Sequence, residues 1–298
     1  SVFMSQAAIA IENAYLYNNL ESLVDDRTRE LQVRTEELEE KSRELGDAYE
    51  KLNETYDIMK KDLFLARRIQ ENILPEKTLS LGGLRLHAEY RPLIEVGGDI
   101  FDYLLRDDGT VRVFIADATG HGVVASLVTM LIKSEYEKVK NDRGRPSDVL
   151  ARLNDVFFRS YRSLKIFFTG IIIDIDVKKG RFTYGSAGHP DQYLLHDGAV
   201  VELPNTGRAV ALHHTIDIEN RTMKFSPDDR LLVFTDGIFE EFNSSQEQLG
   251  EERIKKVFAA VIGEKTADII RAIIRCVNEH TRDSQISDDI TIIGIERG

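Results

Sequence analysis

Hydrophobic residues recur every seven positions over the first quarter of the chain, with charged residues between them. The repeated positions are Leu31, Leu38, Leu45, Leu52 and Met59. Residues 1–74 contain no proline and a single glycine, so nothing in this segment interrupts a helix. The pattern predicts one long helix that forms a coiled coil.

The a positions of this predicted coiled coil combine polar, aromatic and apolar residues. If the leucines take the d positions, the a positions are Thr35, Ser42, Tyr49, Tyr56, Leu63 and Gln70. Leucine at d is common in parallel dimers, whereas polar or bulky residues at a weaken the pairing. We therefore expect a parallel homodimer with an adjustable interface; the alternative is a solitary charged helix.

After residue 75 the pattern changes to short hydrophobic runs separated by turn residues. Runs of β type lie at 84–93, 111–118, 167–177, 180–188, 191–203, 220–226, 230–238 and 288–297, and helical patterns lie at 122–140, 146–162, 251–261 and 266–281. Asp-Gly or Lys-Gly pairs, which begin at residues 108, 179 and 197, are typical of hairpin turns. Strands and helices come in runs instead of alternating, which predicts an α+β fold with packed antiparallel sheets.

Aspartates stand at the ends of several hydrophobic runs. Asp117 and Asp236 each end a run, Asp288 and Asp289 begin one, and Asp99 follows a pair of glycines. Each alone is also explained by turn chemistry. Carboxylates that meet at one sheet edge, however, repel one another unless a cation lies between them. Oxygen donors without nearby cysteine or paired histidines favour Mg²⁺ or Mn²⁺ over Zn²⁺.

Composition narrows the possible functions. The formal net charge of −12 and the lack of a basic stripe argue against a nucleic-acid partner and suit cation binding. The only cysteine, Cys276, lies in a hydrophobic pattern and predicts a buried, unreactive thiol. No apolar run suits a signal peptide or membrane span, so we expect a cytoplasmic chain without membrane insertion. The chain starts without methionine in helix-like sequence, and we expect it to be part of a longer protein.

Five motifs carry a resemblance to a known family. In order, they are "VGGDIFDY", "ADATGHG", "GSAGHP", "TDGIFEEFN" and "DDITIIGI", and "ARRIQENILP" precedes them. They resemble the metal-dependent protein phosphatases of the PPM family, and more closely its bacterial RsbU/SpoIIE branch. The resemblance covers about residues 63–298 and implies a β-sandwich of two antiparallel sheets flanked by helices, preceded here by the long coiled-coil helix.

The resemblance also suggests a division of the chain. Residues 1–20 include "SQAAIAIENAYLY", which is similar to the closing helix of GAF sensor domains. Residues 21–66 would form the coiled-coil linker. Residues 67–298 would form the phosphatase domain, with a switch helix at 67–74.

The resemblance implies roles for particular residues. Asp117 would bridge two Mn²⁺ or Mg²⁺ ions, and the carbonyl of Ala118 would add a ligand. Asp236 and Asp288 would hold one ion, and Asp99 would serve the other, partly through water. Asp99 and Asp117 would thus contribute to catalysis through a water that the metals activate.

Other residues near the motifs have open roles. Asp289 stands where eukaryotic members usually have asparagine and is the weaker candidate ligand. His121 is either the general acid for the leaving seryl oxygen or a loop histidine with a local hydrogen bond. His189 is predicted to shape a turn. Arg91 stands too far before Asp99 to be assigned as the phosphate-binding group, and the glycine pair offers backbone N–H groups instead.

The implied activity is hydrolysis of phosphoserine or phosphothreonine on a regulatory protein. In the resembling branch this substrate is typically a STAS-type anti-sigma-factor antagonist, so that dephosphorylation frees a sigma factor through partner switching. Direct attack by water needs no phosphoenzyme. We expect an upstream sensor to change the packing of the coil, which would move residues 67–74 and favour metal binding near Asp99 and Asp117.

Two other readings remain open. One is a catalytically inactive signalling scaffold that binds phosphorylated partners through the phosphatase fold. The other is a two-metal phosphohydrolase that acts on a small molecule. The presence of all four aspartates argues against the first, and the order of the motifs argues against the second.

Overall fold

The structure is a computed structural model of the chain and describes residues 2–120, 122–261, 263–282, 284 and 286–298. These residues divide into two units, residues 2–62 and Leu63–Gly298. Helix α1 (Val2–Ile73) confirms the predicted long helix. Residues 3–62 of this helix are all exposed in the single chain.

The second unit contains two antiparallel sheets. In sheet order, the first consists of β1 (Thr78–Leu81), β2 (Leu84–Arg91), β11 (Ile290–Arg297), β10 (Arg230–Phe234), β7 (Gln192–His196) and β8 (Ala199–Leu203). The second consists of β3 (Asp99–Leu105), β4 (Val111–Ala118), β5 (Phe168–Asp176), β6 (Arg181–Ala187) and β9 (Arg221–Lys224). The predicted α+β class with two antiparallel sheets is confirmed.

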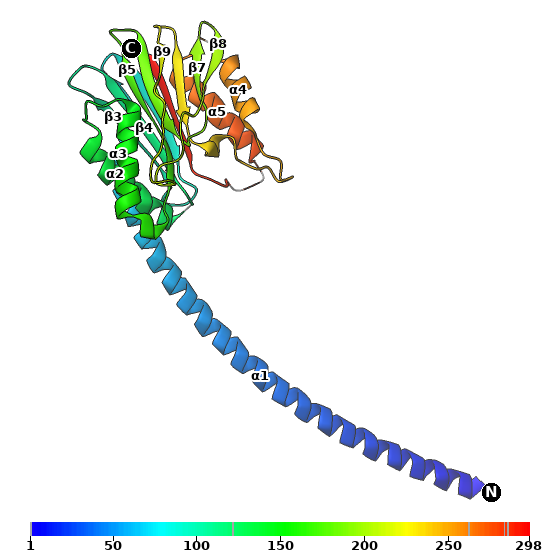
Figure 1. Ribbon diagram of the computed structural model, residues 1–298. Helices are drawn as coiled ribbons and strands as arrows, with labels where there is room; N and C mark the ends of the chain where they lie inside the picture. The colour runs from blue at the N-terminus through cyan, green and yellow to red at the C-terminus, as the bar shows by residue number, and fades with distance from the viewer. Residues whose placement is uncertain (1, 121, 262, 283, 285) are drawn as a thin grey trace. The chain divides into compact units, whose positions relative to one another are not determined.

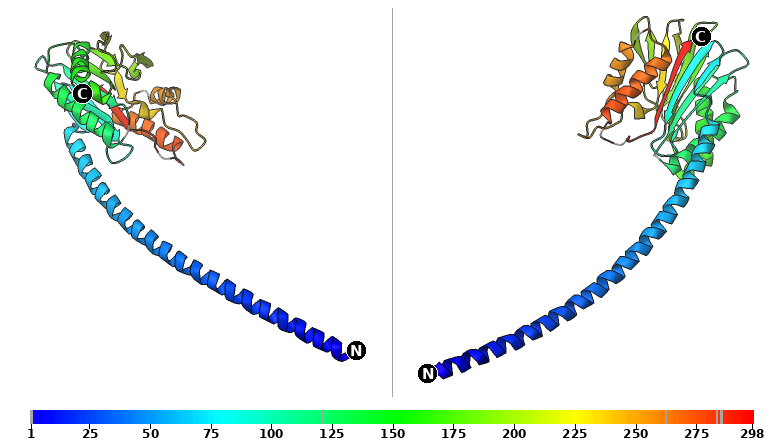
Figure 2. Two further views of the ribbon diagram at one scale, coloured as in Figure 1. Left: turned by 60° about the horizontal axis from the view of Figure 1, so that its bottom comes forward. Right: turned by 180° about the vertical axis from the view of Figure 1, so that it is seen from behind.

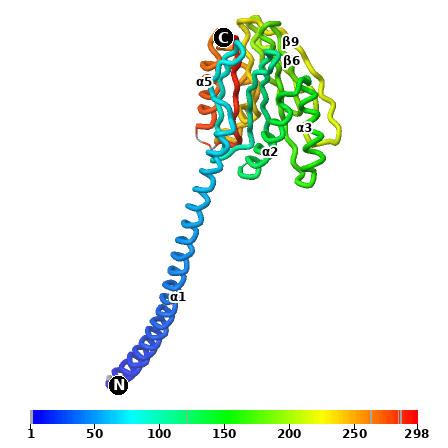
Figure 3. Tube along the Cα trace, turned by 90° about the vertical axis from the view of Figure 1, so that its left-hand side faces the viewer, coloured from blue at the N-terminus to red at the C-terminus, as the bar shows by residue number. Residues whose placement is uncertain are grey.

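Helices cover the outer face of each sheet. Helices α2 (Val123–Val139) and α3 (Pro146–Ser160) pack on the β3-to-β9 sheet, whereas α4 (Glu251–Ala260) and α5 (Thr266–His280) pack on the β1-to-β8 sheet. Figure 1 shows the two helix pairs on opposite sides of the strands, and the views in Figure 2 and Figure 3 agree. Two 3₁₀ turns, η1 (Arg162–Leu164) and η2 (Asp236–Ile238), complete the described elements.

Three hydrophobic layers result from this arrangement. The inner layer, between the sheets, includes Phe101, Ile173 and Ile293, and the outer layers lie beneath α2–α3 and beneath α4–α5. Strand β5 is buried along nearly its whole length because one face meets the other sheet and the other meets α3. This explains its continuous apolar run, which contrasts with the alternation in β2.

The turns and strands differ from the sequence predictions at a few places. The predicted turn glycines Gly109, Gly180 and Gly198 all have positive φ, at 81°, 60° and 76°, as such turns require. Strands β1 and β3 were missed. Strand β3 is buried on both faces from Asp99 to Tyr103, so it shows no alternation of polar and apolar residues.

Candidate metal centre

The centre is built on the pairing of β3 with β4. In this antiparallel register Asp99 lies directly opposite Asp117, and the negative charge of Asp117 raises the pKa of Asp99. Carboxylates this close repel each other, which favours the protonated form of each. Without a cation, the fold therefore brings together two acidic side chains that cannot both ionise freely.

Asp99 is the more deeply buried of the pair, with 1% of its surface exposed. Its Oδ2 accepts hydrogen bonds from Thr235 Oγ1 at 2.8 Å and from Thr291 Oγ1 at 2.5 Å. Burial, followed by the charges of Asp117 and Asp289, raises the pKa of Asp99 well above its usual range, and the two hydroxyls only partly oppose this rise. The residue that follows β10 and a residue of β11 thus fix the orientation of an aspartate on β3.

The other predicted aspartates act on Asp117. Burial raises the pKa of Asp117 to about 8, and the negative charges of Asp236 and Asp288 add to the rise. Burial and the charge of Asp288 raise the pKa of Asp236 to about 6. The structure therefore brings Asp99, Asp117, Asp236 and Asp288 into one electrostatic cluster, as expected if a cation belongs among them.

Asp289 has a different position from its neighbour Asp288. It is 3% exposed, and its carboxylate accepts hydrogen bonds from Leu93 N at 2.6 Å and from Gly98 N at 2.5 Å. These bonds fix both ends of the loop that leads into Asp99. The geometry makes Asp289 an anchor of this loop, as an asparagine at this position could also be.

Glu241 was not singled out in the sequence, although it lies within the motif "TDGIFEEFN". It is fully buried, and its carboxylate accepts hydrogen bonds from the backbone N–H groups of Ser287 and Asp288. Burial raises the pKa of Glu241, against the effect of these bonds. Glu241 thereby positions the segment that carries Asp288.

Gln70 on α1 was also missed as a site residue. It is 2% exposed, and its side-chain amide donates to Gly97 O at 2.7 Å and accepts from Gly97 N at 3.1 Å. Tyr90 donates to the same amide oxygen at 3.2 Å. The end of α1 therefore contacts the backbone two residues before Asp99. In the sequence, Gln70 is one of several polar residues at the a positions, and nothing in that pattern indicates a contact with Gly97.

Glycines allow the segments of the centre to approach one another. Ala118 N donates to Gly98 O at 2.9 Å, and a Cβ on Gly98 would lie 3.2 Å from the Ala118 carbonyl oxygen. A Cβ on Gly237 would overlap the carbonyl oxygen of Asp289. At Gly237 only glycine fits without moving the backbone, whereas at Gly98 a larger residue would require its neighbours to shift by a few tenths of an ångström.

The chemistry of the donors fits a hard divalent cation. The predicted ligands are all carboxylate or carbonyl oxygens, the type that Mg²⁺ and Mn²⁺ prefer. Burial, followed by the charges of neighbouring carboxylates, raises the pKa values of Asp99, Asp117 and Asp236. Within the described part of the chain, no three His, Cys, Asp or Glu side chains are close enough to enclose one ion. The fit therefore rests on the donor type and on the electrostatic coupling of the carboxylates.

Of the three remaining candidate residues, two form hydrogen bonds within the fold and one lies outside the residues that the structure describes. His121 lies outside the described residues. His189 is fully buried, its Nδ1 lies 2.9 Å from Thr169 Oγ1, and burial lowers its pKa to about 3. Arg91 bonds Glu89 and Asn278, so its guanidinium is engaged on the face of β2 beneath α5.

The fold and the carboxylate cluster define a phosphatase domain of the PPM type, the PP2C-like class of serine/threonine phosphatases. The chain belongs to the SpoIIE family: the model of this family, described as stage II sporulation protein E (SpoIIE), matches residues 107–298. The predicted branch within the PPM phosphatases is thus confirmed.

Two phosphoserine phosphatases of Bacillus subtilis are similar to the chain in sequence. The chain is 26% identical over 185 residues to the phosphoserine phosphatase RsbP of Bacillus subtilis, covering 61% of this chain and 46% of RsbP. It is 24% identical over 241 residues to the phosphoserine phosphatase RsbU of the same organism, covering 80% of this chain and 71% of RsbU. The chain thus spans less than half the length of RsbP.

A solved structure shares the fold. The SiaA-PP2C domain of Pseudomonas aeruginosa superimposes with a TM-score of 0.72 at 22% identity, over 81% of this chain and 98% of that domain. In the part of the chain that the structure describes, no helix combines the length and apolar character needed to cross a membrane.

Proposed function

We propose that this chain is a metal-dependent protein serine/threonine phosphatase that hydrolyses phosphoserine or phosphothreonine on a regulatory protein. The observation that carries the proposal is the opposition of Asp99 and Asp117 on β3 and β4, with pKa values raised by burial and by the neighbouring carboxylates. The names of RsbP and RsbU as phosphoserine phosphatases support the same activity.

In this proposal Asp99, Asp117, Asp236, Asp288 and the carbonyl of Ala118 would hold two Mn²⁺ or Mg²⁺ ions. When bound, the ions would lower the pKa of a water nucleophile and offset charge on the transferring phosphoryl group. The carboxylates must lose their protons to bind cations.

The surrounding residues keep the carboxylate donors in place. Thr235 and Thr291 orient Asp99, Asp289 fixes the preceding loop, and Glu241 fixes the segment of Asp288. His121 is retained as the candidate proton donor to the leaving seryl oxygen.

The proposed substrate is a phosphorylated STAS-type anti-sigma-factor antagonist, which would place the chain in sigma-factor regulation by partner switching. This part rests on the relationship to RsbU and RsbP.

Regulation is proposed to act through α1. Residues 1–20 would form the end of the last helix of a GAF-like sensor, and residues 21–66 would pair as a parallel coiled coil. Residues 67–74 would act as the switch helix of the phosphatase domain at 67–298. The contacts of Gln70 with Gly97 support this route, because a shift of the helix end would pull on the backbone that precedes Asp99.

The activity is tested by phosphate release with Mn²⁺ from p-nitrophenyl phosphate and from a phosphorylated STAS-type protein. The native chain should hydrolyse both, and Asp117→Asn should lose nearly all activity. Asp107→Asn is the matched control, since Asp107 is exposed before β4. Binding of the phosphoprotein without hydrolysis would instead support the scaffold, and hydrolysis of p-nitrophenyl phosphate alone would support a small-molecule enzyme.

A further inference from the structure

A surface cavity of about 550 Å³ lies beside the segment that follows Asp117. It is formed by the end of α3, the residues after η1 and the loop at 211–214. Its lining residues include Phe158, Arg162, Lys165, Phe167, Leu212 and His214. We name this set of residues the η1 surface.

The η1 surface is tied directly to the candidate metal centre. The carbonyl of Phe167 accepts hydrogen bonds from Thr119 Oγ1 at 2.9 Å and Thr119 N at 3.4 Å. Thr119 is two residues after Asp117, and Asp117 pairs in register with Thr169 on β5. Two residues of extended chain span about 7 Å. A peptide with its phosphorylated residue at the centre could therefore place flanking residues on the η1 surface.

Buried hydrogen bonds hold the η1 surface in shape. Asn154 on α3 is 2% exposed, and its side chain donates to the carbonyls of His213 and His214 and accepts from Ala211 N. The guanidinium of Arg162 lies 5.0 Å from the centre of the Phe158 ring. The surface is thus organised before a partner arrives, which lowers the entropy that binding costs.

The chemistry of the η1 surface is apolar and cationic. Leu212 is 48% exposed and Phe167 is 36% exposed. Arg162 and Lys165 are both exposed, and neither forms a salt bridge with any described residue. The lining contains no Asp or Glu, although the chain as a whole carries a net charge of −12.

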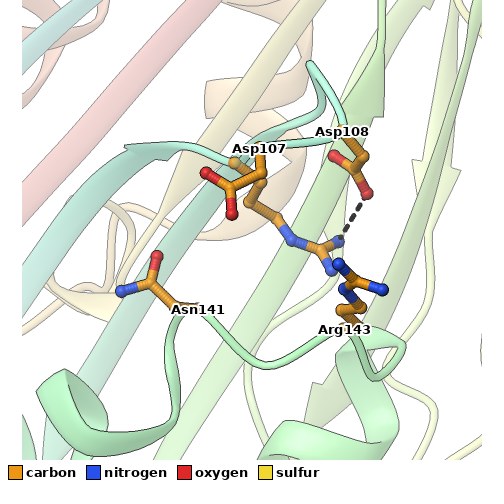
Figure 4. A pocket seen from close by; sticks show the side chains of 5 residues that line it. Asp107, Asp108, Asn141 and Arg143 are labelled. Atoms are coloured by element: carbon orange, nitrogen blue, oxygen red, sulfur yellow. Dashed lines mark ion pairs between the residues drawn. The ribbon is translucent and has the colours of Figure 1, made fainter.

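Another arginine-lined cavity lacks these properties. The cavity shown in Figure 4 is lined by Arg106, Arg143, Asn141 and two aspartates, and Arg106 pairs with Asp108 across it. It lies next to the start of β4, whereas Asp117 is near the end of that strand, a separation of about 20 Å along the strand. Arg143 therefore provides an exposed control arginine away from the centre.

We propose that the η1 surface binds acidic and apolar residues that flank the phosphorylated residue of the protein substrate, and so selects among phosphoproteins. This inference rests on the proposed phosphatase function and deepens it. Arg162 and Lys165 attract flanking carboxylates, and Phe158, Phe167 and Leu212 contact flanking apolar side chains. Arg162 and Lys165 contribute to binding of the substrate and not to the hydrolysis step.

Synthetic phosphoserine peptides test this specificity. One peptide has Glu and Leu flanks, a second replaces Glu by Lys, and a third has Ser and Gly flanks. With Mn²⁺, the native chain should show the highest kcat/KM on the Glu/Leu peptide. Arg162→Ala with Lys165→Ala should raise its KM about fivefold or more, with kcat and p-nitrophenyl phosphate hydrolysis unchanged. Arg143→Ala should match the native chain, and Arg162→Glu with Lys165→Glu should favour the Lys peptide.

Binding separates this inference from the proposed function. Fluorescence anisotropy of the same labelled peptides with the native chain in chelator does not depend on turnover. Preferential binding of the Glu/Leu peptide in chelator, together with no hydrolysis of any peptide or of p-nitrophenyl phosphate in the Mn²⁺ assay, would support the η1 surface and refute the phosphatase. Equal binding of all three peptides would overturn the inference even if p-nitrophenyl phosphate is hydrolysed. The same holds if Arg143→Ala weakens binding of the Glu/Leu peptide as much as Arg162→Ala with Lys165→Ala does.

Discussion

Asp99 and Asp117 face each other across two strands, but the protein supports them unequally. Asp99 receives two threonine hydroxyl hydrogen bonds, which fix one of its oxygens. For Asp117, burial and the negative charges of Asp236, Asp288 and Asp289 raise the pKa to about 8. A cation beside Asp117 would offset these charges, in agreement with its proposed bridging position.

The hydroxyl of Thr291 should contribute to metal affinity without touching the metal. Thr291→Val keeps the shape of the side chain and removes the 2.5 Å hydrogen bond to Asp99. We expect Mn²⁺ affinity to fall about tenfold to a hundredfold, as is typical when a residue that orients a ligand is lost. Isothermal titration calorimetry measures the change. Thr222→Val is the control, because Thr222 is exposed on β9 and bonds only Thr183. Equal affinities in the two variants would contradict the expected role.

The stability of the metal-free chain should fall as the pH rises from about 6.5 to about 8.5. The pKa of Asp117 is raised to about 8 in the fold, so the folded state holds this proton more tightly than the unfolded chain. Its contribution is complete at low pH and is lost as the pH rises through the folded pKa. The lowered pKa of His189, about 3, has the opposite effect, but only below the ordinary histidine range.

The measurement is Tm by calorimetry in chelator across this window. Asp117→Asn should flatten the decline, because the titrating proton is gone. Added Mn²⁺ should raise Tm more at the alkaline end, where proton competition for the carboxylates is weakest. If the Tm of the native chain rises with pH in the same way as that of Asp117→Asn, the raised pKa of Asp117 is ruled out.

At the scale of elements, the end of α1 and the loop before Asp99 form one hydrogen-bonded assembly through Gln70. Gln70→Ala would leave the buried N–H of Gly97 and the hydroxyl of Tyr90 without this partner, at a cost of about 1–3 kcal/mol for each such group. We expect weaker Mn²⁺ binding, by about tenfold, and a lower Tm.

Mn²⁺ titration and calorimetry of Gln70→Ala check this expectation against Asn72→Ala. The Asn72 side chain is on the same helix turn, but it is exposed and bonds only a carbonyl of its own helix. Matching behaviour of the two variants would show that the helix end does not influence the centre. Removal of residues 1–60 in the same assays would show whether the rest of the helix adds to the effect.

Local patterns predicted most elements but not the contacts that complete the centre. The helices and the strands around Asp117 and Asp236 follow from periodicity and turn residues. Strand β3 was missed because burial on both faces removes the alternation. Gln70 and Glu241 were missed because their partners lie far along the chain, and a single sequence carries no local signal for such bonds.

At the scale of the whole molecule, the apolar heptad positions of α1 are exposed to solvent in the single chain. Leu38 and Leu45 are 68% and 71% exposed, in a helix of 72 residues. Helices in proteins gain most of their stability from the packing of an apolar face against a partner. We therefore predict that the chain is a parallel dimer with twice the monomer mass of 33.9 kDa, whereas residues 67–298 alone are monomeric.

Light scattering measures these masses, and substitutions in α1 identify the seam. Leu38→Glu with Leu45→Glu should yield monomers, whereas Glu40→Ala with Asp47→Ala, on the opposite face of the heptad, should leave the dimer intact. Leu38→Cys should form an interchain disulfide in a parallel, in-register pair, because equivalent d positions then face each other. Cys276 is buried and does not compete for oxidation. A dimer that persists in residues 67–298, or one that Leu38→Cys does not cross-link, would place the interface elsewhere or reverse the orientation of the helices.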